Sequence, residues 1–329
     1  MTNKEYHMVN KCPIHINSHD DVIKALTDEQ FYVRPVNQKV PKILEGSLAG
    51  NVFASLVRMR DDQLQTKIKL AIINSIDQYD VSLLSQQTFT VAKILTLNLK
   101  NTQQLNQFIA DVPICVIAGL FQISERHWPE LVNYVRSFID DVILNPQEER
   151  VQQADLATKY LFHIIKKSEG GLLQNLRLGF KQQGIEDDFL VLSNCIGLFF
   201  QTADGTSGLL GQMLIHYSDL KSAPEDILTE VLSQNPPIKF TKRFPNKETK
   251  LTGHAITEED TLLLDLKTEQ GSVPFGLGEH QCPGSEWAKA ISLAAFNYLR
   301  SLPLNSSLFT DYRWKELGNA AIPIFYDKE

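Results

Sequence analysis

The chain has 329 residues, of which 43% are apolar, and this is enough to bury a sizeable core in one domain or in two closely packed lobes. Its 39 acidic and 32 basic residues leave a net charge of −7, and neither sign forms a long run, which argues against a general nucleic-acid binder. The N-terminus is polar, and the longest apolar stretch, residues 112–121, is too short to span a bilayer. We therefore expect a cytoplasmic protein without a membrane segment.

The four cysteines lie far apart in the sequence and form no Cys-x-x-Cys pair. This spacing favours neither a zinc site nor a disulfide scaffold. We expect three of them, Cys12, Cys115 and Cys195, to pack as small apolar residues. Cys282 is the exception, because its surroundings have a distinct pattern.

The first 60 residues predict a short strand, a short helix and a long loop. Residues 11–16 are strand-like, and Ser18 begins a helix signal that runs to residue 26. Residues 32–57 contain prolines and glycines among mixed side chains, a composition that interrupts helices.

From residue 61 to residue 235 apolar side chains recur with helical periodicity, and proline and glycine mark many of the breaks. Two extended runs follow, at residues 238–244 and 261–266, and a further helix is predicted over residues 285–302. The pattern indicates a mainly α protein with a small β region, of the α+β class.

A glycine-rich loop, residues 271–284, places Cys282 just before the last of these helices. Glycines allow close approach of the backbone to a flat ligand, and the free N–H groups of a helix N-terminus favour a thiolate over a thiol. A thiolate is the axial ligand that pushes electron density onto haem iron. From spacing alone, a surface turn that carries a buried cysteine is the alternative.

Residues 275–284 resemble the cysteine-ligand signature of the cytochrome P450 enzymes, Phe-x-x-Gly-x-His/Arg-x-Cys-x-Gly, with every defining position present. The resemblance implies a b-type haem whose iron is bound by Cys282, with Phe275, Gly276 and Gly284 at the cofactor. It also implies a reduced form of the family fold, in which the haem lies between a long central helix and the cysteine loop.

Four further residues resemble positions that bind the haem propionates in this family. Arg243 follows the segment Pro236-Pro237, and His280 lies two residues before the cysteine. Gln65 and Lys69 stand where the family has a histidine and an arginine on one helical face. An ordinary loop histidine and a solvated polar face are the alternatives for His280 and for the Gln65–Lys69 pair.

Residues 194–214 resemble the central helix, and the family's acid–alcohol pair falls on Asp204 and Gly205. The usual threonine is therefore missing, and Thr206 is one residue too late. One residue is about 100° of helical rotation, so Thr206 points elsewhere unless the helix bulges. We take Asp204, Gly205 and Thr206 as the candidate catalytic set, with proton delivery by Asp204, by water or by the substrate.

The sequence departs from the family in other places. Ser233 replaces the arginine that pairs with Glu230, so Glu230 should find another partner or be exposed. Only 38 residues separate Arg243 from Cys282, and little precedes the first strand. We therefore expect a single domain over residues 1–329 that lacks part of the N-terminal region and much of the segment before the cysteine loop.

The resemblance implies an oxidoreductase of secondary metabolism that hydroxylates a small or carrier-tethered substrate, with electrons from a ferredoxin or flavin protein. Lys289 is a candidate for docking that donor, with solvated surface charge as the alternative. The substrate would lie against Phe200, Gln201, Ile238 and Phe240. Core packing is the alternative for Phe200, Ile238 and Phe240.

Two other functions remain open. Gly205 is compatible with peroxide-driven oxidation, dehydration, rearrangement or oxidative coupling. Loss of the threonine and of the arginine at Ser233 is compatible with a non-catalytic binding or recruitment protein, although such a protein has no need of a thiolate ligand.

Overall fold

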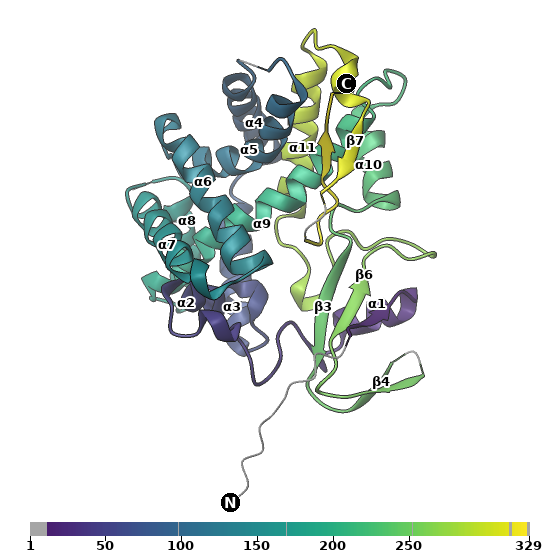
Figure 1. The fold of residues 1–329 in the computed structure, drawn as a ribbon. Coiled ribbons are helices and arrows are strands. Elements are labelled where there is room, and N and C mark those ends of the chain that lie inside the picture. Colours follow the sequence, from purple (N-terminus) through teal and green to yellow (C-terminus); the bar gives the residue numbers. More distant parts are fainter. Residues whose placement is uncertain (1–11, 98, 169, 252, 316–317, 328–329) are drawn as a thin grey trace, which may run out of the picture.

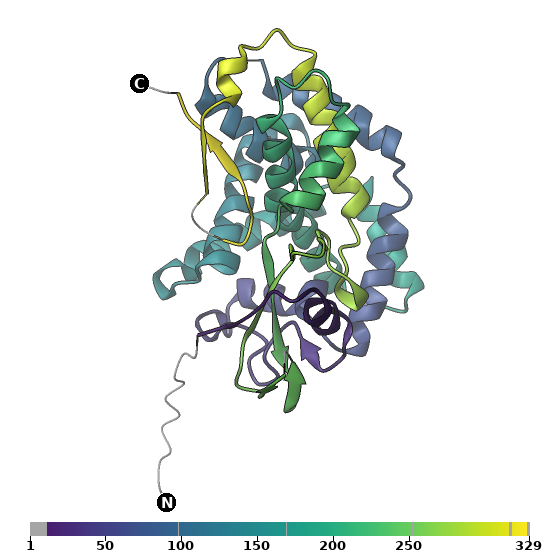
Figure 2. The ribbon, with the colours of Figure 1, turned by 90° about the vertical axis from the view of Figure 1, so that its right-hand side faces the viewer.

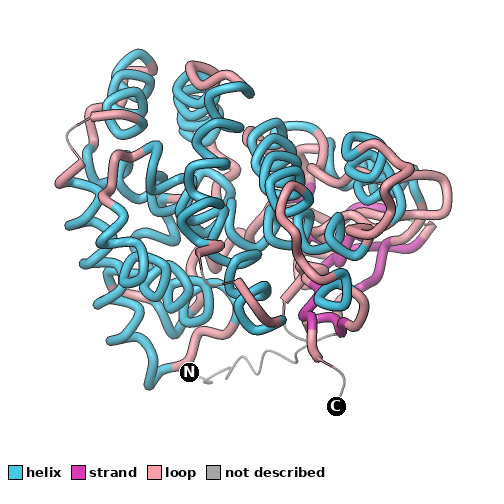
Figure 3. Tube along the Cα trace, turned by 90° about the horizontal axis from the view of Figure 1, so that it is seen from above, coloured by secondary structure: helices cyan, strands magenta, loops and turns pink. Residues whose placement is uncertain are grey.

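The structure is a computed structural model, and it describes residues 12–97, 99–168, 170–251, 253–315 and 318–327. Helices make up one side of the molecule and most of the strands the other (Figures 1 and 3). This arrangement confirms the predicted α+β class, with a small β region beside a larger helical one.

The helices follow the apolar periodicity of the sequence. Their bounds are α1 His19–Thr27, α2 Leu48–Ser55, α3 Gln63–Ile76, α4 Val81–Leu95, α5 Thr102–Leu120, α6 Trp128–Phe138, α7 Val151–Lys166, α8 Leu172–Gln182, α9 Asp188–Ile215, α10 Pro224–Gln234 and α11 Ser285–Arg300. After α6 the chain continues as a π-helical segment, Ile139–Leu144. The predicted helix over residues 285–302 is therefore confirmed by α11.

Helix α9 runs through the middle of the helical region and packs against α5, α11, α2 and α7 (Figure 1). Asp187 caps its N-terminus by accepting hydrogen bonds from the backbone N–H groups of Phe189 (2.9 Å) and Leu190 (3.2 Å). Most of its 28 residues are buried, which explains its near-continuous apolar sequence. The predicted central helix, residues 194–214, is thus confirmed and begins six residues earlier.

The main sheet has the strand order β1-β6-β3-β2. Its strands are β1 Ile14–Ile16, β2 Phe31–Tyr32, β3 Phe240–Pro245 and β6 Leu262–Asp265. β3 pairs antiparallel with β6, and β6 pairs parallel with β1. The two extended runs of the sequence therefore form the centre of this sheet. Lys11, the first residue of the predicted strand, lies outside the described residues.

The prediction of one long loop over residues 32–57 was wrong, because α2 lies within it. The side chain of Ser47 caps α2 by accepting from the backbone N–H of Gly50 at 2.9 Å. A Cβ on Gly50 would lie 2.0 Å from the backbone oxygen of Leu44, so this glycine allows close packing and does not interrupt the helix. The buried side of α2, including Val52 and Phe53, packs on α7 and α9.

Two hairpins complete the β region: β4 Thr249–Leu251 with β5 His254–Ile256, and β7 Tyr312–Trp314 with β8 Pro323–Phe325. The second hairpin lies beside α9 and α5, as the two perpendicular ribbon views agree (Figures 1 and 2). It brings the C-terminal part of the chain to the central helix.

Candidate functional site

The cysteine loop turns back on itself just before α11. The backbone N–H of Cys282 donates to the backbone oxygen of Phe275 at 2.9 Å, which closes the loop. Gly276 and Gly278 both have φ of 69°, and a Cβ on Gly278 would lie 3.0 Å from the backbone oxygen of Leu26. Gly284 is the N-cap residue of α11. The sequence prediction that the loop delivers Cys282 to a helix N-terminus is confirmed.

Burial and nearby charges act in opposite directions on the Cys282 thiol. It is exposed to solvent, yet burial among protein atoms raises the pKa of its thiol above the ordinary value. A hydrogen bond from the backbone N–H of Gly284 and the charges of Arg58 and Lys69 act in the opposite direction and lower that pKa. We use the name Cys282 recess for the surroundings of this thiol, which include Arg58 and Lys69.

Arg58, in the short 3-10 helix Val57–Met59, is near enough to Cys282 for the charge of each group to act on the other. Its side chain is also exposed, while burial lowers the pKa of the guanidinium and the charge of Cys282 raises it. The sequence analysis missed this residue. The only signal was a single cation within the apolar run Leu56-Val57-Arg58-Met59, inside a segment that was interpreted as a loop.

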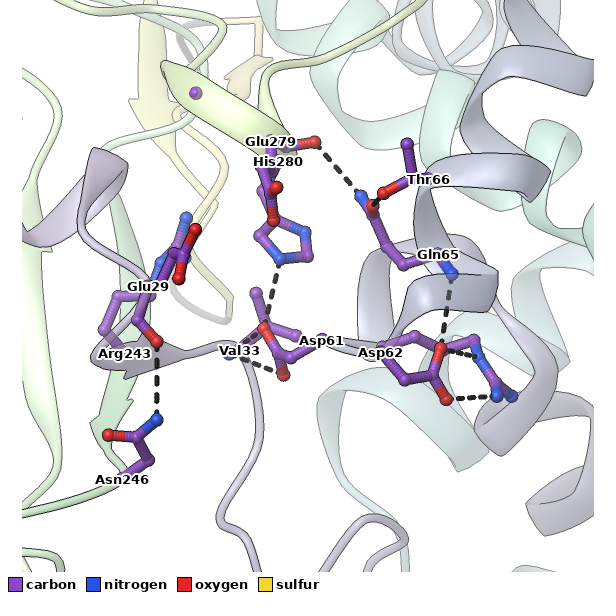
Figure 4. A network of polar contacts seen from close by, with 12 residues as sticks. Glu29, Val33, Asp61, Asp62, Gln65, Thr66, Arg243, Asn246, Glu279 and His280 are labelled. Carbon is purple, nitrogen blue, oxygen red and sulfur yellow. Dashed lines mark hydrogen bonds and ion pairs between the residues drawn. The ribbon is translucent and has the colours of Figure 1, made fainter.

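His280 contacts Asp61, which precedes α3 (Figure 4). The His280 Nε2 and an Asp61 carboxylate oxygen lie 3.1 Å apart, and both Asp61 oxygens accept from the backbone N–H of Val33 at 3.1 Å. Burial lowers the pKa of Arg243 to about 10, with the charge of Asp61 raising it and that of Arg58 lowering it. The carboxylate of Asp61, which the sequence analysis did not identify, thus contacts one predicted propionate donor, His280, and its charge acts on the other, Arg243.

Gln65 and Lys69 reach from α3 to the cysteine loop. The Gln65 side-chain amide donates to the backbone oxygen of Glu279 at 3.1 Å (Figure 4), and Lys69 donates to the backbone oxygens of Glu279 and Gly278. Gln65 is buried and Lys69 is half-buried. The solvated-face alternative therefore does not hold for Gln65, and both side chains support the loop in this structure.

The residues of the Cys282 recess are compatible with a haem. The charges of Arg58 and Lys69 act on the Cys282 thiol. His280 contacts Asp61, and the charges of Asp61 and Arg58 act on Arg243. Within the described part of the chain no group of three or more His, Cys, Asp or Glu side chains could hold a metal ion. A one-thiolate site lined by cations suits an iron held mainly by a macrocycle that carries two carboxylates.

On α9, Asp204 and Gly205 lie near the C-terminal hairpin. Asp204 and Lys315, which follows β7, are 3.9 Å apart. Burial raises the pKa of the Asp204 carboxyl, helped by the charge of Asp140 and opposed by those of Lys315 and Arg136. Lys315 was missed in the sequence analysis, because its hairpin was not predicted.

Thr206 is not brought to the Asp204 side of the helix. Its side chain is 1% exposed, and its backbone oxygen accepts a hydrogen bond from Ser292 of α11 at 3.4 Å. α9 is a regular α-helix from Asp188 to Ile215, without the bulge that could have turned Thr206. A Cβ on Gly205, by contrast, would meet only the Cδ1 atom of Ile238, at 3.9 Å, so there is room for a side chain.

The four predicted substrate contacts are distributed unevenly. Phe200 is 4% exposed, and its ring packs against Phe138 with centroids 5.6 Å apart, which favours the core alternative. Ile238 is half-buried next to Gly205, and Gln201 is half-buried one turn before it on α9. Phe240 is half-buried at the start of β3.

The region of the missing arginine is open. Glu230 is exposed, as predicted for a carboxylate without its usual partner, and Ser233 is exposed as well. A cavity of about 390 Å³ lies here, apart from Cys282, and its lining includes Ser233, Ser272 and Lys289. Lys289 pairs with Glu286 at 2.8 Å and remains one-third exposed.

The remaining cysteines confirm the packing expectation only in part. Cys115 and Cys195 are buried, and burial raises the pKa of both thiols. Cys12 is exposed, so that prediction was wrong for it: this residue precedes β1 and is not part of its buried side. None of the helices in the described ranges is long and apolar enough to cross a membrane.

Comparison with known proteins yields structural relatives alone. No protein-family model matches the sequence, and none of the curated proteins does. CalO2 superimposes with a TM-score of 0.79 at 13% identity, covering 94% of this chain and 89% of that chain. P450BioI, solved in complex with hexadec-9Z-enoic acid ligated acyl carrier protein, gives 0.72 at 16% identity (94% and 90% covered). CYP109B1, a versatile cytochrome P450 enzyme from Bacillus subtilis, gives 0.71 at 14% identity (95% and 92% covered). The chain has the fold of the cytochrome P450 superfamily.

Proposed function

We propose that this protein is a haem-thiolate oxidoreductase in which Cys282 binds the iron of a b-type haem. The observation that carries the proposal is the setting of the Cys282 thiol: it is exposed just before the N-terminus of α11, and the charges of Arg58 and Lys69 act on it. A structural cysteine would instead be buried among apolar side chains, as Cys195 is.

The cofactor, when bound, supplies the iron chemistry that activates oxygen or peroxide toward an organic substrate. The chain supplies the ligand and the orientation. Arg243 and His280 are the propionate donors in this proposal, while Gln65 and Lys69 hold the loop backbone at Glu279. Phe275, Gly276 and Gly284 form the part of the loop that would approach the macrocycle. The backbone N–H of Gly284 donates a hydrogen bond to the Cys282 sulfur.

On α9, Asp204 is the group that we propose to hold a proton. Its raised pKa keeps a larger fraction of the carboxyl protonated than a solvent-exposed aspartate would have, and Lys315 lies 3.9 Å away. Gly205 leaves space beside Ile238 that a substrate can fill. We place the substrate against Gln201, Gly205 and Ile238.

We further propose that the substrate is a small organic molecule or one tethered to a carrier protein, and that its oxidation is a hydroxylation in secondary metabolism. The carrier alternative is supported by P450BioI, which was solved with a ligated acyl carrier protein. Electrons would come from a separate ferredoxin or flavin protein.

Reconstitution of purified protein with hemin tests the proposal. We expect the wild type to bind hemin with a thiolate-type absorption spectrum, and Cys282→Ser to lose that spectrum. Cys12→Ser is the matched control, because Cys12 is exposed and precedes β1, outside the cysteine loop, and it should behave as the wild type. A thiolate-type spectrum that persists in Cys282→Ser would exclude Cys282 as the ligand.

A second candidate function, peroxide-driven oxidation, is favoured by one observation: no hydroxyl takes the usual position at Gly205, and Thr206 is buried toward α11. Turnover of a test substrate with peroxide, and none with dioxygen plus an electron-donor system, would support this candidate. The reverse result would support the monooxygenase.

A further inference from the structure

The segment that leads into the cysteine loop, residues 266–273, is a turn with two short arms. Lys267 and Ser272 lie opposite each other in an antiparallel bridge. At the tip, Thr268 is 6% exposed and bonds twice to the backbone oxygen of Gly271, through its N–H at 2.8 Å and its hydroxyl at 3.0 Å. The turn is therefore fixed by its own hydrogen bonds, and its two arms keep a defined position relative to each other.

Two side chains of this turn attach it to the C-terminal end of α10. The Ser272 hydroxyl donates to the backbone oxygen of Leu232 at 2.6 Å, and the Lys267 ammonium donates to the backbone oxygen of Ser233 at 3.0 Å. The last carbonyls of a helix lack a partner within the helix, and a cation there also meets the negative end of the helix dipole. Both contacts therefore satisfy groups that α10 itself cannot pair.

The junction between the turn and α10 borders the cavity of about 390 Å³. The lining of this cavity includes Ser272 and Pro274 from the cysteine loop and Leu232 and Ser233 from α10. Side chains at the edge of a cavity have fewer atoms in van der Waals contact than side chains in a closed core. The two hydrogen bonds therefore carry a larger share of the attachment than they would in a closely packed junction.

The attachment is connected to Cys282 by the backbone of the loop. The N–H of Gly276 donates to the oxygen of Val273, the residue after Ser272, at 2.9 Å. The N–H of Cys282 then donates to the oxygen of Phe275, also at 2.9 Å. A displacement of Ser272 would therefore reach Cys282 through a short stretch of chain that these two hydrogen bonds keep folded.

We propose that Ser272, supported by Lys267, is a positioning residue that holds the cysteine loop on α10 and thereby fixes the sulfur of Cys282. It acts through the loop backbone, and Ser233 takes part through its backbone oxygen. The inference rests on the proposed function as far as the iron ligand is concerned. The attachment of the loop to α10 can be measured without a cofactor.

The variants are Ser272→Ala, which removes the hydroxyl, Ser272→Thr, which keeps it, and Lys267→Met. Thr229→Val is the matched control. Thr229 lines the same cavity, but its hydroxyl donates to the backbone oxygen of Glu225 in its own helix, at 2.8 Å. Circular dichroism first establishes that each variant is folded.

Hydrogen–deuterium exchange of the apoprotein, followed by mass spectrometry, measures the first effect. We expect the amides of residues 273–282 to exchange about threefold to tenfold faster in Ser272→Ala, and less so in Lys267→Met, whose lost hydrogen bond is exposed. Ser272→Thr and Thr229→Val should exchange as the wild type. Exchange within α5 serves as the internal reference and should be the same in all variants.

The absorption spectrum of the reduced, haem-loaded protein with carbon monoxide measures the second effect. Ser272→Ala should show a smaller share of the thiolate-type Soret band than Thr229→Val, with the share restored in Ser272→Thr. Loop exchange in Ser272→Ala that equals the wild type overturns the inference, as does an unchanged share of the thiolate band. If the wild type binds no hemin, the proposed function fails instead, and the exchange rates still decide whether Ser272 holds the loop.

Discussion

Replacement of Asn194 by alanine should destabilise the protein strongly, because Asn194 joins α9 to the backbone of Ser55 and Val57. It lies in α9 with 2% of its side chain exposed. Its side-chain oxygen accepts from the Val57 N–H at 2.9 Å, and its amide donates to the backbone oxygens of Ser55 (3.0 Å) and Leu190 (2.9 Å). The substitution leaves the buried N–H of Val57 and the half-buried carbonyl of Ser55 without these partners.

The magnitude follows from the burial of the two groups. A buried N–H without an acceptor costs about 1–3 kcal/mol, and a carbonyl that water can partly reach costs less, so we expect a loss of about 2–4 kcal/mol in the free energy of unfolding. Ser193→Ala is the matched control. Ser193 is also fully buried on α9, but its hydroxyl donates only to the Phe189 oxygen of its own helix, at 2.7 Å, and its loss should cost under about 1 kcal/mol.

Urea unfolding followed by far-UV circular dichroism measures both effects. The shift of the midpoint, multiplied by the wild-type slope, gives the change in the free energy of unfolding for each variant. If Asn194→Ala loses no more free energy of unfolding than Ser193→Ala does, then the Asn194 side chain does not hold the 3-10 helix Val57–Met59 on α9.

Three other predictions follow from the same structure. Gly211→Ala should destabilise the protein by about 1–3 kcal/mol, because the new Cβ would lie 2.8 Å from the Pro323 ring. Gly205→Ala should be neutral or stabilising, because its Cβ would meet only Ile238 Cδ1 at 3.9 Å. Equal unfolding midpoints of the two variants in urea would contradict this. Burial raises the pKa of the Asp204 carboxyl, so its ionisation favours the unfolded state. The free energy of unfolding of the wild type should therefore fall relative to that of Asp204→Asn as pH rises from about 4 through the raised pKa. Unfolding curves at several pH values test this, and a rise over that range would contradict the reasoning. Pro283 lacks an N–H to donate to the sulfur, so the haem-loaded wild type should have a lower iron reduction potential than Pro283→Leu, and equal potentials in redox titration would contradict the reasoning.

The helices and the cysteine loop could be predicted from the sequence because their signals are local. α3 and α11 each bury one face, which leaves a helical periodicity in the sequence. α9 is buried on nearly all sides, and its sequence is accordingly apolar along most of its length. The loop requires glycines with positive φ at Gly276 and Gly278 just before a helix, and this requirement is also visible in the sequence.

The rest depended on contacts between distant segments. α2 was missed because Gly50 reads as a helix breaker, while its actual role is close packing against the backbone of Leu44. Arg58 and Lys315 carry no local signal of their own. The segment of Arg58 is held on α9 by Asn194, which accepts from the Val57 N–H, and Lys315 reaches Asp204 because the C-terminal hairpin lies beside α9. Conversely, the rotation argument for Thr206 was sufficient, because α9 remains regular.

The most direct test of the central claim, thiolate ligation of haem by Cys282, is the absorption spectrum of the reduced protein exposed to carbon monoxide. We expect the Soret band at the position that belongs to thiolate-ligated ferrous-CO haem, and its loss in Cys282→Ser. A histidine-type Soret band in the wild type, or no haem uptake after reconstitution, would contradict the account.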